Sequence, residues 1–175
     1  MRPLSVAVLL LVAMAMQAAH AHAQAQAHTH ATTTWLKGVV THVSDGDTVW
    51  LRPDGNAQAR PLKLRLRGID APERCQAGGH AATVALAGRV KSVEVVVRVV
   101  GTDTYGRLIG DMSRHGDDVG AWMVREGHAW SHRRPGVAST YAKEEREARA
   151  ARRGLFSDPQ AIEPSVFRKR HGPCA

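Results

Sequence analysis

The stretch "LKLRLRGIDAPER", Leu62–Arg74, alternates apolar and basic residues and then changes character. Successive side chains of a β-strand point to opposite faces, so this alternation predicts a strand whose leucines face a core. The basic side chains of the opposite face are Lys63, Arg65 and Arg67. Asp70, a proline turn and Glu73 follow directly. The sequence thus predicts a strand that ends beside two carboxylates.

Segments rich in β-forming residues lie on both sides of this strand. Residues 37–53 contain two such runs around Asp45-Gly46, a strong signal for a tight turn. Two further strands are predicted at 92–101, which is rich in β-branched residues, and at 102–114. Helical patterns occupy residues 80–87, 117–127 and 139–154. These elements predict an α+β, mainly β fold: a five-stranded barrel of the oligonucleotide-binding type (OB-fold) decorated with about three helices.

The first residues have the pattern of a targeting segment. Arg2 precedes "LSVAVLLLVAMAM", an apolar run too short to span a bilayer, and Ala-x-Ala patterns follow it. We expect residues 1–23 to be a secretory signal peptide that is cleaved after Ala23, with an uncleaved membrane anchor as the alternative. The expected location is therefore periplasmic or secreted, with no stable membrane insertion after cleavage.

The rest of the chain divides into three parts. Residues 24–34 are polar and are expected to form a flexible leader, and residues 35–157 to form the folded domain. Residues 158–175 are basic and interrupted by prolines, so no regular structure is assigned to this C-terminal tail. We expect a monomer.

The chain is strongly basic. Its 24 Lys and Arg residues against 16 Asp and Glu give a net charge of +8, and loss of Arg2 with the signal would leave +7. A small exported domain with this charge attracts polyanions, such as nucleic acid, anionic lipid or acidic polysaccharide. Charge alone does not choose among these three.

The chain has two cysteines, Cys75 and Cys174. A disulfide between them is allowed in an oxidising compartment, where it would tie the tail to the turn after Asp70. Two free thiols are the alternative, and spacing does not decide the pairing. Neither cysteine has the spacing of a metal ligand.

Three carboxylates are candidates for a metal site. Asp47 follows the Asp45-Gly46 turn, and Asp70 and Glu73 flank Pro72. Oxygen-only ligands at converging strand ends suit Ca²⁺ or Mg²⁺ rather than zinc. The alternative is that the aspartates only form turns and that Glu73 begins a helix.

Two arginines favour the site over that alternative. Arg65 lies on the non-core face of its strand, and Arg107 follows the turn "DTYG". A planar guanidinium binds phosphate with two hydrogen bonds and stabilises the charge that develops in phosphoryl transfer. A basic face, an acidic cluster and a turn arginine together supply what phosphodiester hydrolysis requires.

Four motifs then resemble one known family. The phrases "VSDGDTVWL", "LRLRGIDAPE", "TDTYGRLIG" and "MVREGHAW" are similar to motifs of the staphylococcal nuclease (thermonuclease) family, in the same order and at similar spacings. The resemblance covers about residues 35 to 156. It implies an OB-fold barrel with three helices, in agreement with the predicted elements.

The resemblance also implies roles for individual residues. Asp47, Asp70 and the backbone carbonyl of Ala71 would bind Ca²⁺. Glu73 would act as general base on the attacking water, and Arg65 and Arg107 would hold the scissile phosphate. Three further residues are candidates for substrate binding: Lys63, Arg67 and Tyr105. For the first two, solvated surface charge is an equal alternative, and for the tyrosine, packing in the turn.

The implied activity is that of a Ca²⁺-dependent endonuclease. It would cleave DNA and RNA, with single strands favoured, at the bond to the 5′-oxygen and leave 3′-phosphates. Two alternatives remain open: a non-catalytic OB-fold protein that binds nucleic acid, and an envelope-surface protein that adheres through its charge. Neither alternative requires all five of the matched acidic and arginine side chains.

Overall fold

The structure is a computed structural model that describes residues 34–133, 136–172 and 174. The expected signal peptide and the expected leader up to residue 33 lie outside these residues. Thr34, the first described residue, already belongs to a strand. Within the described ranges, every helix is too short or too polar to cross a membrane.

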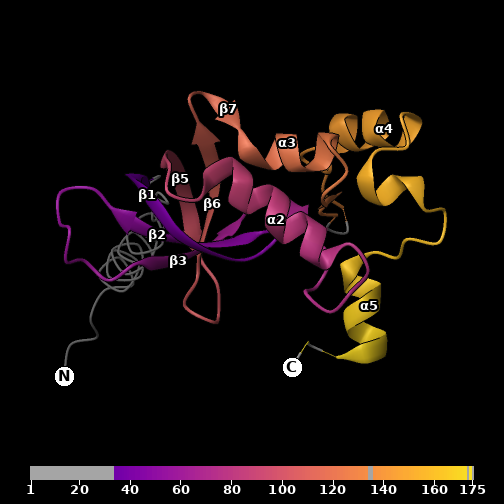
Figure 1. Ribbon diagram of the computed structural model, residues 1–175, viewed down its shortest axis with the longest axis horizontal. Helices are drawn as coiled ribbons and strands as arrows, with labels where there is room; N and C mark the ends of the chain where they lie inside the picture. Colours follow the sequence, from indigo (N-terminus) through magenta and orange to yellow (C-terminus); the bar gives the residue numbers. More distant parts are fainter. Residues whose placement is uncertain (1–33, 134–135, 173, 175) are drawn as a thin grey trace, which may run out of the picture. The chain divides into compact units, whose positions relative to one another are not determined.

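Five strands form a closed barrel (Figure 1). Their hydrogen-bonded order is β3-β2-β1-β5-β6, with antiparallel neighbours, and a parallel pairing of β3 with β6 closes the ring. The strands are β1 (Thr34–Asp45), β2 (Thr48–Pro53), β3 (Leu62–Leu66), β5 (Glu94–Thr102) and β6 (Leu108–Arg114). The prediction of a five-stranded OB-type barrel is confirmed.

Shorter elements surround the barrel. Two-residue strands β4 (Ile69–Asp70) and β8 (Trp130–Ser131) pair with each other, and β7 (Asp117–Asp118) extends the sheet beyond β6. The predicted helices are present as α2 (Gly79–Val90), α3 (Val119–Arg125) and α4 (Ala142–Ala150), and a 3₁₀ turn η1 (Gly154–Ser157) follows. Helix α2 packs against β1, and α3 packs against α4.

The alternation in β3 determines what is buried. Leu64 and Leu66 are 0% and 2% exposed and belong to the core, whereas Leu62, at the start of the strand, is 38% exposed. Most other core side chains are aliphatic and come from the barrel strands and from α2 and α3. The opposite face of β3 is left free to carry charge at the barrel edge.

The tail departs from the prediction. Residues 158–175 were assigned no regular structure, but α5 (Pro164–His171) lies within them. Pro164 occupies the first turn, where its fixed φ suits a helix and its missing N–H costs nothing. Four basic residues in the last turn interact favourably with the helix dipole. These end signals outweigh the proline-rich composition of the tail.

Helix α2 begins against the loop that carries Glu73. A Cβ atom added to Gly79 would lie 1.9 Å from the carbonyl oxygen of Glu73, whereas one added to Gly88 in the same helix would meet nothing within 4 Å. We expect Gly79→Ala to lower the free energy of unfolding by about 1–3 kcal/mol through overpacking. The matched control Gly88→Ala should raise it by about 0.5–1 kcal/mol, because a helix favours alanine over glycine.

Urea unfolding of both variants measures this difference. Equal free energies of unfolding for Gly79→Ala and Gly88→Ala would show that the loop carrying Glu73 moves away from the added methyl group at little cost. In that case α2 does not fix the position of Glu73.

Candidate active site

The β1–β2 turn brings Asp47 against β4. The backbone N–H of Asp47 donates to Asp45 Oδ1 (3.1 Å), and Asp47 Oδ2 accepts from the N–H of Ala71 (3.2 Å). Gly46 permits this approach, since a Cβ there would lie 2.6 Å from the Cβ of Ala71. Segments 24 residues apart therefore hold Asp47 next to the end of β4.

One guanidinium joins the two aspartates. Arg65 Nη1 donates to Asp47 Oδ1 at 2.7 Å, and its Nη2 donates to Asp70 Oδ1 at 3.0 Å. Both carboxylates are buried, at 3% and 4% exposure. Because the two nitrogens of one planar group reach one carboxylate each, the aspartates lie close enough to face a common cation.

Burial changes the acidity of Asp47. It raises the pKa of this carboxyl group to about 7, and the neighbouring carboxylates Asp45 and Asp70 add to the effect. The Arg65 guanidinium and the Ala71 N–H lower the pKa but do not compensate. The site therefore holds more negative charge than its buried position favours, and additional positive charge there would be stabilising.

Glu73 is linked to this pair through an arginine that sequence reasoning missed. Arg168 of α5 donates from Nη1 to Glu73 Oε1 (2.8 Å) and to Asp70 Oδ1 (3.2 Å), and from Nη2 to Asp70 Oδ2 (3.1 Å). The signal for this residue was the helix start at Pro164 followed by a basic run. It was overlooked because the tail was assigned no structure.

The donor set fits a hard cation. Among the described residues, no group of three or more His, Cys, Asp or Glu side chains is arranged so that it could hold a metal ion. Asp47 and Asp70 nevertheless present buried oxygen atoms toward one positive group, and oxygen ligands are those that Ca²⁺ prefers. The residues that would hold the ion are Asp47, Asp70 and Ala71.

Arg107 and Tyr105 lie in the β5–β6 turn. Arg107 Nε donates to Asp103 Oδ2 (2.7 Å), and its guanidinium lies 5.5 Å from the ring centre of Tyr105, which is 84% exposed. Among the residues that the structure describes, no hydrogen bond or ion pair joins Arg107 to the acidic cluster. The structure thus groups Asp47, Arg65, Asp70 and Glu73, and it leaves Arg107 with Asp103.

The other two basic candidates also have partners. Arg67 donates from Nε and Nη2 to the two oxygens of Asp111, at 2.7 and 2.9 Å, and Arg98 binds the same carboxylate. The Lys63 ammonium lies 5.7 Å from the ring centre of Trp50. The role of Lys63 and Arg67 in substrate binding stays a prediction. The Arg67 guanidinium already donates hydrogen bonds to Asp111.

The two cysteines are joined. A disulfide links Cys75, two residues beyond Glu73, to Cys174. Gln76 adds a second link, because its Oε1 accepts from the Glu73 N–H (3.1 Å) and its Nε2 donates to the Ile162 carbonyl (2.7 Å). The loop after β4 is thereby tied to both ends of α5.

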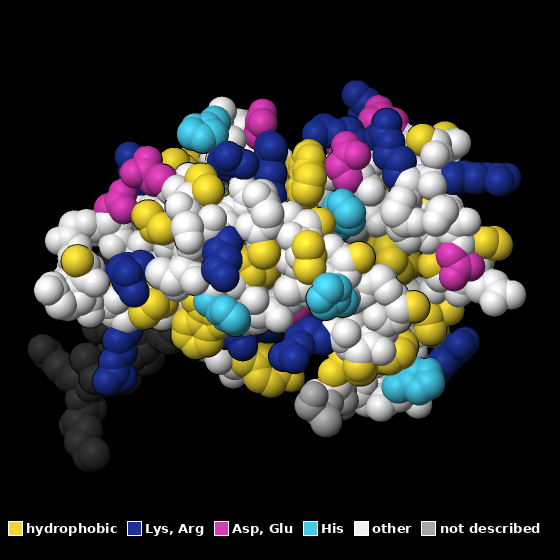
Figure 2. Space-filling view, in the orientation of Figure 1, with side chains coloured by type: hydrophobic (Ala, Val, Ile, Leu, Met, Phe, Trp, Pro, Cys, Tyr) yellow, Lys and Arg dark blue, Asp and Glu magenta, His cyan; other side chains and the backbone are white. Residues whose placement is uncertain are grey.

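The surface around these elements is basic. On the face shown in Figure 2, Lys and Arg side chains are spread over the whole visible area rather than confined to one patch. A distributed positive charge of this kind attracts a long polyanion without selecting a sequence. Carboxylates and guanidinium groups gathered at one edge are the groups that hydrolysis of phosphate esters uses.

Comparison with known proteins agrees with this class. The family described as "Staphylococcal nuclease homologue" matches residues 63–158. The chain is 40% identical to Protein ParB of Escherichia coli over 79% of its own length and 84% of that protein. It is 37% identical to a micrococcal nuclease of Shigella flexneri (76% and 80%) and 32% identical to an uncharacterized endonuclease of Haemophilus influenzae (75% and 72%).

The chain therefore belongs to the staphylococcal nuclease homologue family. As a member of that family it is a nuclease, and hence a hydrolase.

The bridge made by Arg65 can be tested through stability. Arg65→Lys replaces the two-armed guanidinium by a single ammonium, so one buried carboxylate loses a charged hydrogen-bond donor, and we expect a loss of about 1–3 kcal/mol in the free energy of unfolding. Arg107→Lys is the matched control. It should cost less, because Asp103 still accepts the N–H groups of Tyr105 and Arg107.

Chemical unfolding of both variants at pH 8 in EDTA makes the comparison. If Arg65→Lys were as stable as the Arg107 variant, the fork between the aspartates would not be a structural requirement.

Proposed function

We propose that this nuclease is a Ca²⁺-dependent endonuclease that hydrolyses phosphodiester bonds of DNA and RNA. The observation that carries the proposal is the pair of buried aspartates, Asp47 and Asp70, that share the fork of Arg65. Glu73, whose side chain is 28% exposed, lies at the same edge and can reach solvent. The printed names of the relatives, micrococcal nuclease and endonuclease, support the same reaction.

Each residue has a role in this proposal. Asp47, Asp70 and the Ala71 carbonyl would hold the ion, which would polarise a phosphate oxygen when bound. Glu73 accepts the proton of the attacking water. As the water oxygen bonds to phosphorus, the bond to the 5′-oxygen breaks, and the leaving oxygen takes up a proton.

Two arginines act on the phosphate. Arg65 already lies beside both aspartates, where its charge would stabilise the negative charge that builds on the phosphate oxygens. Arg107, in the β5–β6 turn, would have to exchange Asp103 for the phosphate when substrate binds. The proposal therefore gives Arg107 a substrate-dependent position.

Export is part of the proposal. The apolar segment after Arg2 and the Cys75–Cys174 disulfide both support a periplasmic or secreted location, because disulfides persist in oxidising compartments. Mass spectrometry of the protein recovered from the periplasm or medium should find a chain that begins at Gln24. A chain that retains Met1 would contradict the cleavage.

The reaction is tested with single-stranded DNA and with RNA of mixed sequence. Chain expressed without the signal is incubated with each, in Ca²⁺ or in EDTA, and the products are separated on a gel. We expect digestion that starts within the strand, requires Ca²⁺ and leaves 3′-phosphate ends. Retention of nucleic acid that weakens with salt, without cleavage in either buffer, would instead identify a non-catalytic binding protein.

Glu73→Gln tests the general base. The amide cannot take a proton from water, so we expect kcat to fall by about 10²–10⁴-fold while KM changes by less than about threefold. Glu147→Gln, on the exposed face of α4, is the control and should keep full turnover. Turnover of Glu73→Gln equal to that of the control would exclude Glu73 as the base.

A further inference from the structure

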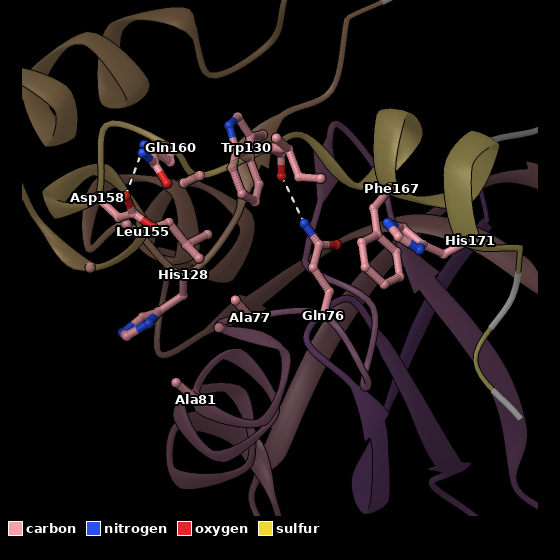
Figure 3. Close-up of a pocket in the computed structure, with 15 residues that line it drawn as sticks. Gln76, Ala77, Ala81, His128, Trp130, Leu155, Asp158, Gln160, Phe167 and His171 are labelled. Atoms are coloured by element: carbon pink, nitrogen blue, oxygen red, sulfur yellow. Dashed lines mark hydrogen bonds between the residues drawn. The ribbon is translucent and has the colours of Figure 1, made fainter.

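Helix α5 stands beside the candidate active site, with Pro164 buried and Val166 and Phe167 half-buried. A pocket of about 510 Å³ lies between α5 and the segments around the start of α2, β8 and η1 (Figure 3). Phe167 and His171 of α5 line one side of this cavity, and Trp130 and Leu155 line the other. Within α5, Pro164 is the residue that is buried. Hydrophobic packing therefore contributes little to holding this helix in place.

Two links fasten α5 to the loop that carries Glu73. One is the Cys75–Cys174 disulfide, and the other is the hydrogen bond from Gln76 to the Ile162 carbonyl, drawn in Figure 3. Their attachment points are two and three residues beyond Glu73. The disulfide is the covalent one of these two links, and it joins the segment that follows α5 to the Glu73 loop.

Helix α5 places one positively charged group, the Arg168 guanidinium, at the site. The Arg168 fork engages both oxygens of Asp70 and one oxygen of Glu73. Two carboxylates three residues apart repel each other, and a shared guanidinium removes that repulsion and fixes their separation. Asp70 is then held between Arg65 and Arg168, whose donors approach it from a barrel strand and from the tail.

We propose that α5 is a redox-dependent part of the active site, in which Arg168 positions Glu73 and Asp70 and the Cys75–Cys174 disulfide keeps Arg168 there. This inference rests on the proposed function of the same carboxylates. Reduction by a dithiol would break the S–S bond, leave a thiol on each cysteine and release the dithiol as its own disulfide. Release of α5 would then withdraw Arg168 and lower turnover.

The test is a cycle of four chains. They are the wild type, Arg168→Ala, Cys75→Ser with Cys174→Ser, and the combination of all three changes. Arg168→Ala keeps the disulfide, so it tests the arginine even if the serine variant folds poorly, and thermal unfolding of each chain checks the fold. Arg170→Ala is the matched control, because it removes an exposed arginine from the same helix.

Two readouts are taken for each chain. The first is kcat and KM on single-stranded DNA with Ca²⁺. The second is hydrogen exchange of the amides of residues 73–78 in calcium-free buffer, which reports the order of the Glu73 loop without any catalysis.

We expect Arg168→Ala to lower kcat by about 10–100-fold with KM changed by less than about threefold, and Arg168→Lys to recover part of the loss. The serine variant should fall toward the Arg168→Ala value, and the combined variant should fall no further, because both changes act through the same guanidinium. Exchange of the amides of residues 73–78 should accelerate by about tenfold in Arg168→Ala, the serine variant and the combined variant. Arg170→Ala should match the wild type in both readouts.

Several results would overturn the proposal. Losses of kcat that multiply in the combined variant would show that the disulfide does not act through Arg168. A higher kcat in Arg168→Ala would make the arginine a competitor for the carboxylates rather than a positioning residue. A wild type that cleaves nothing would refute the proposed function, while unchanged hydrogen exchange in Arg168→Ala would separately refute the positioning.

Discussion

The structure depends on one shared fork: the Arg65 guanidinium between the buried carboxylates of Asp47 and Asp70. Burial makes unpaired charge costly, so the fork allows two aspartates to occupy one interior edge of the barrel. The β1–β2 turn, strand β3 and strand β4 meet there, and each contributes one of the three groups. The same contact that stabilises the fold therefore also assembles the candidate active site.

The domain adds a second guanidinium from outside the barrel. Arg168 arrives on a helix that stands over a cavity and is fastened by a disulfide spanning 99 residues. The barrel alone provides Asp47, Arg65 and Asp70, whereas the surroundings of Glu73 depend on the tail. The site therefore has two parts, one at the barrel edge and one on the disulfide-linked helix α5. The cellular redox state could alter the part that belongs to α5.

The sequence predicted the elements and contacts that lie within a short stretch of chain or follow from the alternation of a strand. Alternation over Leu62–Leu66 and the Asp45-Gly46 turn led to the barrel, and the same stretch of sequence contains Arg65 and Asp70 five residues apart. The partners of Arg67 and Arg107 were not foreseen; for Arg67 the partner, Asp111, is 44 residues away. Arg168 was missed because its place at Asp70 arises from a tertiary contact across 98 residues that no periodicity reports.

The central claim is that Asp47 and Asp70 face one common hard cation at this edge. Calorimetric titration of the disulfide-bonded chain with Ca²⁺, without nucleic acid, tests it most directly. The account predicts one ion per chain and an affinity at least about tenfold weaker in Asp70→Asn, with the surface variant Asp117→Asn unchanged. Equal Ca²⁺ affinity in all three chains, or no binding by the wild type, would contradict it.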